Sequence, residues 1–188
     1  MKLSRIASLL AGVGILAGAQ VALAGDGTIN FTGTIQDSTC VVDLADPHNQ
    51  TVALIPVNKN TFTGMGDTAG WQEFKILLKN CGNAHTTARA NFESGTTVNG
   101  QGRLHNTDET GSVAGTAKGV DLQLRQAASG QDVVIGSASQ LSLDGFTIDT
   151  TAGTAELRYS AGYYARVAPA SIEPGTVKSS VTYSITYQ

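Results

Sequence analysis

The 188-residue sequence has few cysteines, few basic residues and few long apolar runs, and each of these shortages excludes or disfavours a class of protein. It has only 2 cysteines, so it is not a small domain built on a dense disulfide framework. Its 12 basic residues are outnumbered by 15 acidic ones, which disfavours a nucleic-acid-binding surface. No apolar run of membrane-spanning length follows residue 24, so we expect no stable membrane insertion of the remaining chain. The chain after residue 24 is long enough to bury a hydrophobic core of its own.

Residues 1–24 have the pattern of a secretory signal peptide. Lys2 and Arg5 supply a positive start, an apolar stretch follows, and 22–24 read Ala-Leu-Ala, a small-x-small cleavage site. Removing this segment leaves 164 residues and lowers the net charge from −3 to −5, because both of its charges are positive. The pattern predicts export, and in an oxidising compartment Cys40 and Cys81 are expected to form one disulfide.

Short alternating segments rich in β-branched and aromatic residues dominate the rest of the chain, and turn-forming clusters separate them. This pattern predicts an all-β sandwich. The segment 94–116 carries few apolar residues and is expected to be a surface loop or a weak edge strand. The expected strands are 28–36, 51–57, 74–78, 86–92, 119–126, 133–135, 155–167 and 177–187.

The first of these segments alternates without interruption. One face carries the apolar residues and glycines, and the other face carries Thr28, Asn30, Thr32 and Thr34. Taken alone, such a run also fits an ordinary edge strand of the chain's own sheet. The apolar-side residues are Gly27, Ile29, Phe31, Gly33 and Ile35.

The chain ends in a second alternating run. One side carries polar residues, from Lys178 to Thr186, and Ser179 alone interrupts the apolar side. A half-buried last strand is the commoner meaning of such a pattern. The apolar side consists of Val177, Val181, Tyr183, Ile185 and Tyr187.

Together these pieces resemble a known family, the pilins of the chaperone–usher pathway, and most closely the main-shaft subunits of type 1-like fimbriae. The resemblance spans the mature chain and rests on combined motifs at matching spacings. These are Gly-Thr-Ile-Asn-Phe-Thr-Gly at 27–33, Ser-Thr-Cys-Val-Val-Asp at 38–43, Leu-Lys-Asn-Cys at 78–81, Gly175 as the fourteenth residue from the end, and the penultimate Tyr187.

The resemblance implies an incomplete immunoglobulin-like sandwich that lacks its last strand, with a hydrophobic groove that another chain fills. Residues 1–24 would be the signal, 25–36 a donor-strand extension and 37–188 the pilin domain. The donor face from Gly27 to Ile35 would enter a neighbouring subunit's groove. Residues from Gly175 to Tyr187 would line this subunit's own groove and first meet a periplasmic chaperone, which would grip the carboxylate of Gln188.

The same resemblance implies polymerisation by donor-strand exchange at an outer-membrane usher. The product would be a cell-surface fimbria, reached through the periplasm, that supports adhesion. Neighbouring pilin subunits, the chaperone and the usher would be the partners, and no cofactor or metal is implied.

Other classes of function have less support in the sequence. His48, His85 and His105 lack a nucleophile or metal motif around them, so no enzyme is indicated. Trp71 would suit either packing or sugar stacking, with packing favoured. A monomeric β-sandwich that binds a carbohydrate or a protein stays open, because residues 25–36 could complete the same molecule's sheet. A minor or adaptor pilin stays open as well.

Overall fold

The computed structural model describes residues 32, 39–43, 49–110 and 113–188. Residues 35–188 form one compact unit, and the elements below belong to its described part. They are β1 (Val41–Val42), η1 (Lys59–Thr61), β2 (Thr68–Lys79), β3 (Thr87–Phe92), β4 (Leu104–His105), α1 (Thr107–Thr110), β5 (Val120–Gln126), β6 (Asp132–Val133), η2 (Ala138–Ser142), β7 (Phe146–Asp149), β8 (Thr154–Ala165), η3 (Pro169–Ser171) and β9 (Tyr183–Tyr187).

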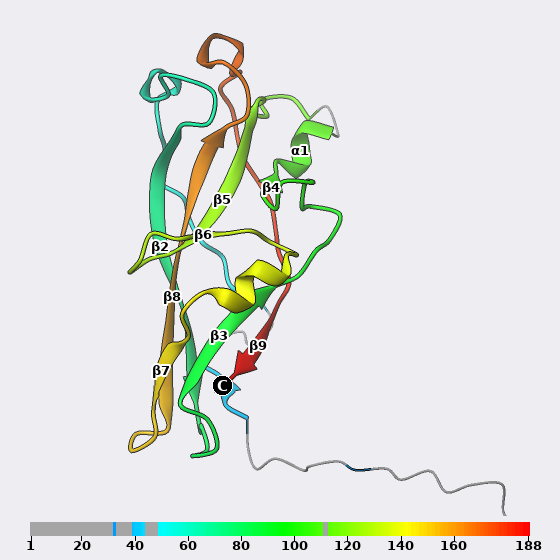
Figure 1. Ribbon diagram of the computed structural model, residues 1–188. Coiled ribbons are helices and arrows are strands. Elements are labelled where there is room, and N and C mark those ends of the chain that lie inside the picture. Colours follow the sequence, from blue (N-terminus) through cyan, green and yellow to red (C-terminus); the bar gives the residue numbers. More distant parts are fainter. Residues whose placement is uncertain (1–31, 33–38, 44–48, 111–112) are drawn as a thin grey trace, which may run out of the picture. The chain divides into compact units, whose positions relative to one another are not determined.

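All ladders between these strands are antiparallel, and they follow the path β1-β2-β8-β7-β3-β9. The long strand β8 pairs with β2 along one edge and with β5 and β7 along the other. Because β7 pairs with both β8 and β3, it joins the two layers into one curled sheet (Figure 1). This arrangement confirms the all-β prediction. No described helix is long and apolar enough to cross a bilayer.

The core lies between the two layers and centres on Tyr159 of β8, which is 1% exposed. Its ring lies 5.0 Å from that of Phe92 in β3 and 5.3 Å from that of Phe146 in β7. Its hydroxyl accepts a hydrogen bond of 3.0 Å from the backbone N–H of Ala90. Burying this polar group costs little because it has a partner in the opposite layer.

The observed strands differ from the expected ones in several segments. β1 and β7 were not expected, and β2 begins at Thr68, six residues before the expected strand 74–78. Residues 51–57 are extended but form no ladder with any described residue, so their assignment as a paired strand was wrong. Of the expected strand 177–187, only Tyr183–Tyr187 pairs as β9. The segment 94–116 contains the two-residue strand β4, which pairs with β5 alone among the strands, so the weak edge strand is confirmed. The same segment contains α1 and buries Leu104 and Asn106, so it is more than a surface loop.

The pH dependence of stability provides a test of this core. Burial raises the pKa of Tyr159 to about 12, whereas tyrosine in an unfolded chain ionises near pH 10. Below that pH both states keep the proton and the contribution is fully present. Between roughly pH 10 and 12 only the unfolded state ionises, so stability should fall by about 2–3 kcal/mol. Urea unfolding from pH 9 to 11.5 should show most of this fall, and Tyr159→Phe should make it smaller; equal slopes in both proteins would contradict the assignment.

Candidate functional site

The last stretch of chain, residues 177–187, has one backbone edge that pairs with its own domain. Glu93 donates its N–H to Thr182 over 2.9 Å, and Gln188 donates to Thr87 over 3.0 Å. Upstream, the backbone oxygen of Lys178 accepts from the N–H of Thr107 over 2.9 Å. The residues held in this way are even-numbered. In an extended chain, consecutive residues direct their N–H and C=O groups to opposite sides.

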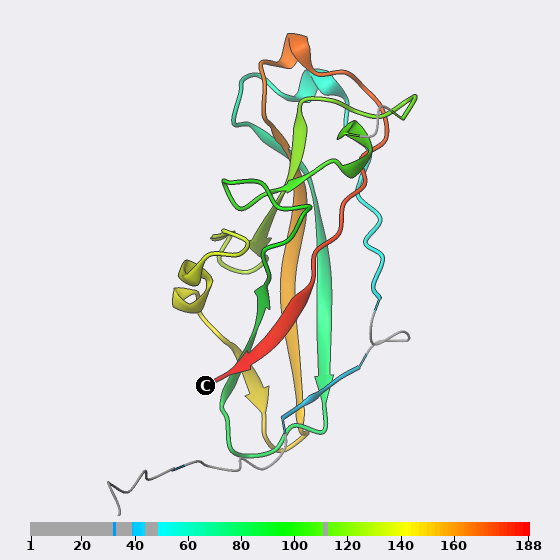
Figure 2. The same cartoon turned by 90° about the vertical axis from the view of Figure 1, so that its right-hand side faces the viewer.

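The odd-numbered residues from Val177 to Tyr187 therefore direct their backbone groups to the side opposite these contacts. No described residue forms a backbone hydrogen bond with these groups. β9 is correspondingly the last strand on the ladder path, outermost in its layer (Figure 2, red). We call residues 177–187, seen from this side, the open edge. Such an edge is a template for pairing with another strand.

The side chains of the open edge are apolar and incompletely covered. Those on the inner side pack against the core cluster yet remain only half-buried, whereas the polar side is exposed except at Thr186. Ser179 alone breaks the apolar side, as the sequence indicated, and its hydroxyl is buried without a hydrogen-bond partner among the described residues. The half-buried side chains are Val177, Val181, Tyr183, Ile185 and Tyr187.

The second wall is the extended segment 51–57. Leu54 packs against the same core cluster as β9, and Val57 against a neighbouring one that also contacts Val177. The backbone of this segment forms no hydrogen bond with another described residue. The site thus has two apolar walls whose main chains are both unpaired within the described part of the chain.

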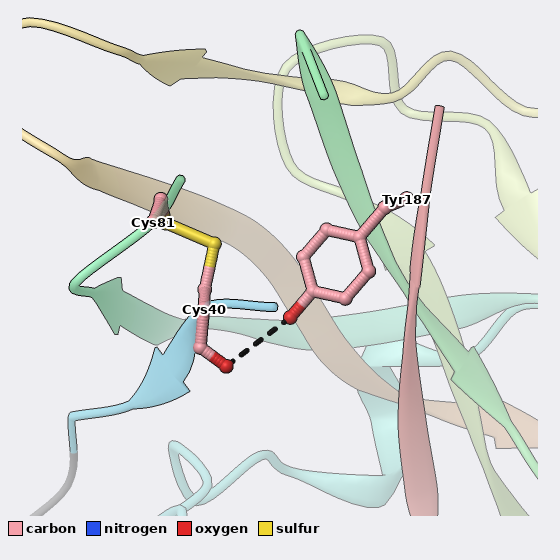
Figure 3. The surroundings of a disulfide bond; sticks show 3 residues. All are labelled: Cys40, Cys81 and Tyr187. Carbon is pink, nitrogen blue, oxygen red and sulfur yellow. Dashed lines mark hydrogen bonds between the residues drawn. A yellow bond between two sulfur atoms is a disulfide. The ribbon is translucent and has the colours of Figure 1, made fainter. Parts of the chain in front are cut away.

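At one end the two walls line a common cavity, and at the other end the open edge contacts Cys40, which is not part of the second wall. At one end, a cavity of about 390 Å³ lies between Val57 and Val177, with Phe62 and Ile172 in its lining. At the other end, the hydroxyl of Tyr187 donates to the backbone oxygen of Cys40 over 3.4 Å (Figure 3). A tyrosine hydroxyl keeps its proton at neutral pH, and burial raises the pKa of Tyr187 further, so this hydroxyl is a donor there.

The disulfide Cys40–Cys81 confirms the expected pairing and fixes the chain where the predicted extension ends. It ties the residue before β1 to the residue two positions after β2. An ion pair of 2.6 Å between Lys79 and Asp43 and the bond from the Asp43 N–H to Leu77 hold the same segment. His85 stacks on Tyr187, with ring centroids 5.4 Å apart.

The upstream half of the open edge depends on one buried amide, that of Asn106, which is 0% exposed. Its nitrogen donates to the backbone oxygens of Ala117 and Thr176, and its oxygen accepts from the N–H of Lys178. Sequence reasoning missed Asn106, because a single asparagine in a polar stretch carries no signal. Gly175 is required beside it, since the backbone of residues 115–117 occupies the space that a Cβ would need.

The histidines and the tryptophan do not form a site among the described residues. His85 is used in stacking and His105 lies in β4, whereas His48 lies outside the described residues. The described residues hold no group of metal-binding side chains. Trp71 has the guanidinium of Arg125 3.7 Å from its ring centroid, and a Cβ at Gly162 would lie 2.6–3.0 Å from its ring atoms. The ring of Trp71 is therefore used in packing against Arg125 and Gly162.

The predicted donor face lies outside the part of the chain that the structure describes. This holds for Gly27, Ile29, Phe31, Gly33 and Ile35, and also for the predicted signal peptide and cleavage site. Only the neighbouring Thr32 is described, and it is exposed.

Comparison with known proteins agrees with this geometry. The family model described as "Fimbrial protein" matches residues 29–188. This chain belongs to the fimbrial protein family. It is 38% identical to the major fimbrial subunit SMF-1 of Stenotrophomonas maltophilia, over 87% of this chain and 94% of that protein. It is 34% identical to the F17 fimbrial protein of Escherichia coli, over 94% and 96%.

Solved structures give the same fold. A type I fimbria protein and antigen of Burkholderia pseudomallei aligns with a TM-score of 0.51 and 32% identity, over 86% of this chain and 97% of that one. The P pilus rod subunit PapA aligns with a TM-score of 0.53, over 79% and 99%, and at 23% identity it supports the fold alone. The fimbrial subunit therefore has the immunoglobulin-like pilin fold.

These relatives also fix the coarse function. They are structural fimbrial subunits and not enzymes, so this chain is a structural subunit of a surface fimbria and polymerises with other pilin subunits. The monomeric binding module is thereby set aside.

Removing the hydroxyl of Tyr187 tests its contact with Cys40 at the end of the open edge. Tyr187→Phe loses one hydrogen bond to Cys40 and keeps the ring, so the free energy of unfolding should drop by about 0.5–1.5 kcal/mol. Thr182→Val, on the exposed side of the same edge, is the control and should change little. Urea unfolding with the disulfide intact measures both. An unchanged midpoint for Tyr187→Phe would show that the contact with Cys40 contributes nothing.

Proposed function

We propose that the fimbrial subunit polymerises by donor-strand exchange, in which residues 25–36 of one subunit fill the groove between the open edge and residues 51–57 of the next. The observation that carries this proposal is the unpaired backbone of the odd-numbered residues 177–187. An inserted strand would supply partners for these groups and cover the half-buried apolar wall.

The extension has the pattern that such a groove requires. Its apolar face repeats every second residue, as does the inner side of the open edge. Burying Ile29, Phe31 and Ile35 at about 1.5–3 kcal/mol each would contribute on the order of 5–9 kcal/mol before backbone bonds are added. Ordering the free extension opposes this gain.

The orientation of the inserted strand follows from the sheet it would join. Every ladder in the described domain is antiparallel, and an antiparallel strand would continue this arrangement. Residues 25–35 and 177–187 are equally long, so end-to-end antiparallel pairing sets Ile35 beside Val177. There the cavity of about 390 Å³ offers space for a branched side chain.

Delivery and location complete the proposal. The predicted signal peptide would bring the chain to the periplasm, where a chaperone lends a strand to the open edge until the usher exchanges it for the next subunit's extension. The exposed last residue, Gln188, lies at the end of β9, which suits recognition of its carboxylate by basic chaperone residues. The resulting fimbria would support adhesion, in a major or minor subunit role.

A matched pair of substitutions in the extension tests this proposal. Phe31→Asp puts a charge on the donated face and should abolish fibre growth, since a charge is too costly to bury in an apolar groove. Thr32→Asp changes the neighbouring, opposite-facing residue and should leave fibres intact. Chaperone binding should survive in both, because the acceptor groove is untouched. Fibre yield by electron microscopy and chaperone co-purification are the measurements; normal fibres from Phe31→Asp would refute the donor assignment.

A further inference from the structure

Arg89, in the middle of β3, is a buried charge without a carboxylate partner. It is only 5% exposed, and none of the ion pairs in the described part of the chain includes it. Its guanidinium donates instead to two neutral oxygens, the backbone oxygen of Leu141 and the side-chain oxygen of Gln188. Burying an arginine with neutral partners alone is costly, so its position requires an explanation.

The first partner belongs to a firmly held segment. η2 is fastened to β3 by the buried side chain of Gln140, whose amide accepts from the N–H of Phe92 over 3.0 Å and donates to its carbonyl over 2.9 Å. Leu141 is therefore fixed relative to β3. One guanidinium nitrogen of Arg89 is thereby held at Leu141, and the other donates to the side chain of Gln188.

The second partner, Gln188, directly follows β9, and the sequence of β9 specifies its pairing register poorly. From Thr182 to Tyr187 the residues alternate polar and large apolar, so a slip of two residues would place like on like. β9 pairs on one edge only, and chain termini fray unless they are tied down. Gln188 is the residue that breaks the repeat, and Arg89 holds its side chain.

We infer that Arg89 is a positioning residue that fixes the register of β9 by holding Gln188. The inference rests on the proposed function for its importance, because the register of β9 decides which side chains an inserted strand meets. Asn106 fixes the start of the same edge at Thr176 and Lys178, so the acceptor wall is held at both ends before any partner arrives.

Register-reporting cysteine pairs test the inference directly on the full chain. Asn91 lies opposite Ser184 in the ladder. Opposite residues have Cα atoms about 5.5 Å apart, within reach of a disulfide, whereas residues two positions off lie about 7–8 Å away. Asn91→Cys is therefore combined with Ser184→Cys, Thr182→Cys or Thr186→Cys, and the fraction of each new disulfide is measured by peptide mapping, with Cys40–Cys81 as internal control.

Each of the three cysteine pairs is made in three backgrounds: Gln188 unchanged, Gln188→Ala and Gln188→Glu. Gln188 is exposed, so its replacement leaves the core intact, unlike replacement of Arg89. With Gln188 unchanged, the disulfide between positions 91 and 184 should form readily, and those to positions 182 and 186 should hardly form. Gln188→Ala should reduce this preference about tenfold, because a hydrogen bond to a charged group is lost. Gln188→Glu should restore it through an ion pair with Arg89. Equal preference in all three backgrounds would overturn the inference.

A second readout separates this inference from the proposed function. A synthetic peptide of residues 25–36 is added to the same chains, and its uptake is followed by fluorescence anisotropy. If the chains that lose the preference for position 184 also take up less peptide, the result supports both the role of Arg89 and donor-strand exchange. Loss of preference in Gln188→Ala with no uptake by any chain supports the role of Arg89 and contradicts donor-strand exchange.

Discussion

An unpaired main-chain edge is the constraint on which the rest of this fold depends. Along residues 177–187 the N–H and C=O groups of the odd-numbered residues have no backbone partner among the described residues, and they lie beside apolar side chains that the domain covers only partly. Polar backbone groups next to apolar surface are costly to leave unsatisfied and prone to nonspecific association. In the proposed function, a strand of another subunit pairs with these groups and covers this surface.

The remaining interactions hold the edge in place. Tyr159 links the two layers beneath β9 through Phe92 and Ala90, and the antiparallel ladder to β3 takes up the inner backbone groups. Asn106 and Arg89 hold the two ends of the edge. The disulfide and the Tyr187 hydroxyl tie the far end to the segment that leads to the predicted extension. A wall held in this way loses little entropy when a strand binds.

Sequence periodicity was sufficient to find the walls but not the contacts that fix them. The alternation of 177–187 predicted the apolar side correctly, because period two is a direct consequence of extended backbone. The same rule suggested a paired strand at 51–57; the segment is extended, yet no described residue pairs with it, since pairing depends on a partner that periodicity does not reveal. Arg89 and Asn106 were missed because their partners, Gln188 and Thr176, are far away in sequence.

The cysteine pair could be predicted because export and an even count leave one pairing, and the comparisons supplied the family. The donor face stays a prediction, as its residues lie outside the described part of the chain. Its assignment rests on alternation and on resemblance, whereas the unpaired state of the open edge is observed in the backbone geometry of the described residues.

The central claim is that the domain is incomplete until residues 25–36 of another subunit enter its groove. The most direct test moves these residues behind Gln188 through a short flexible linker and compares thermal unfolding and gel filtration with the natural order. The account predicts a stable monomer with a much higher midpoint for the rearranged chain, and aggregation, polymerisation or chaperone dependence for the natural one. Two equally stable monomers would contradict it, because they would mean that no strand is missing.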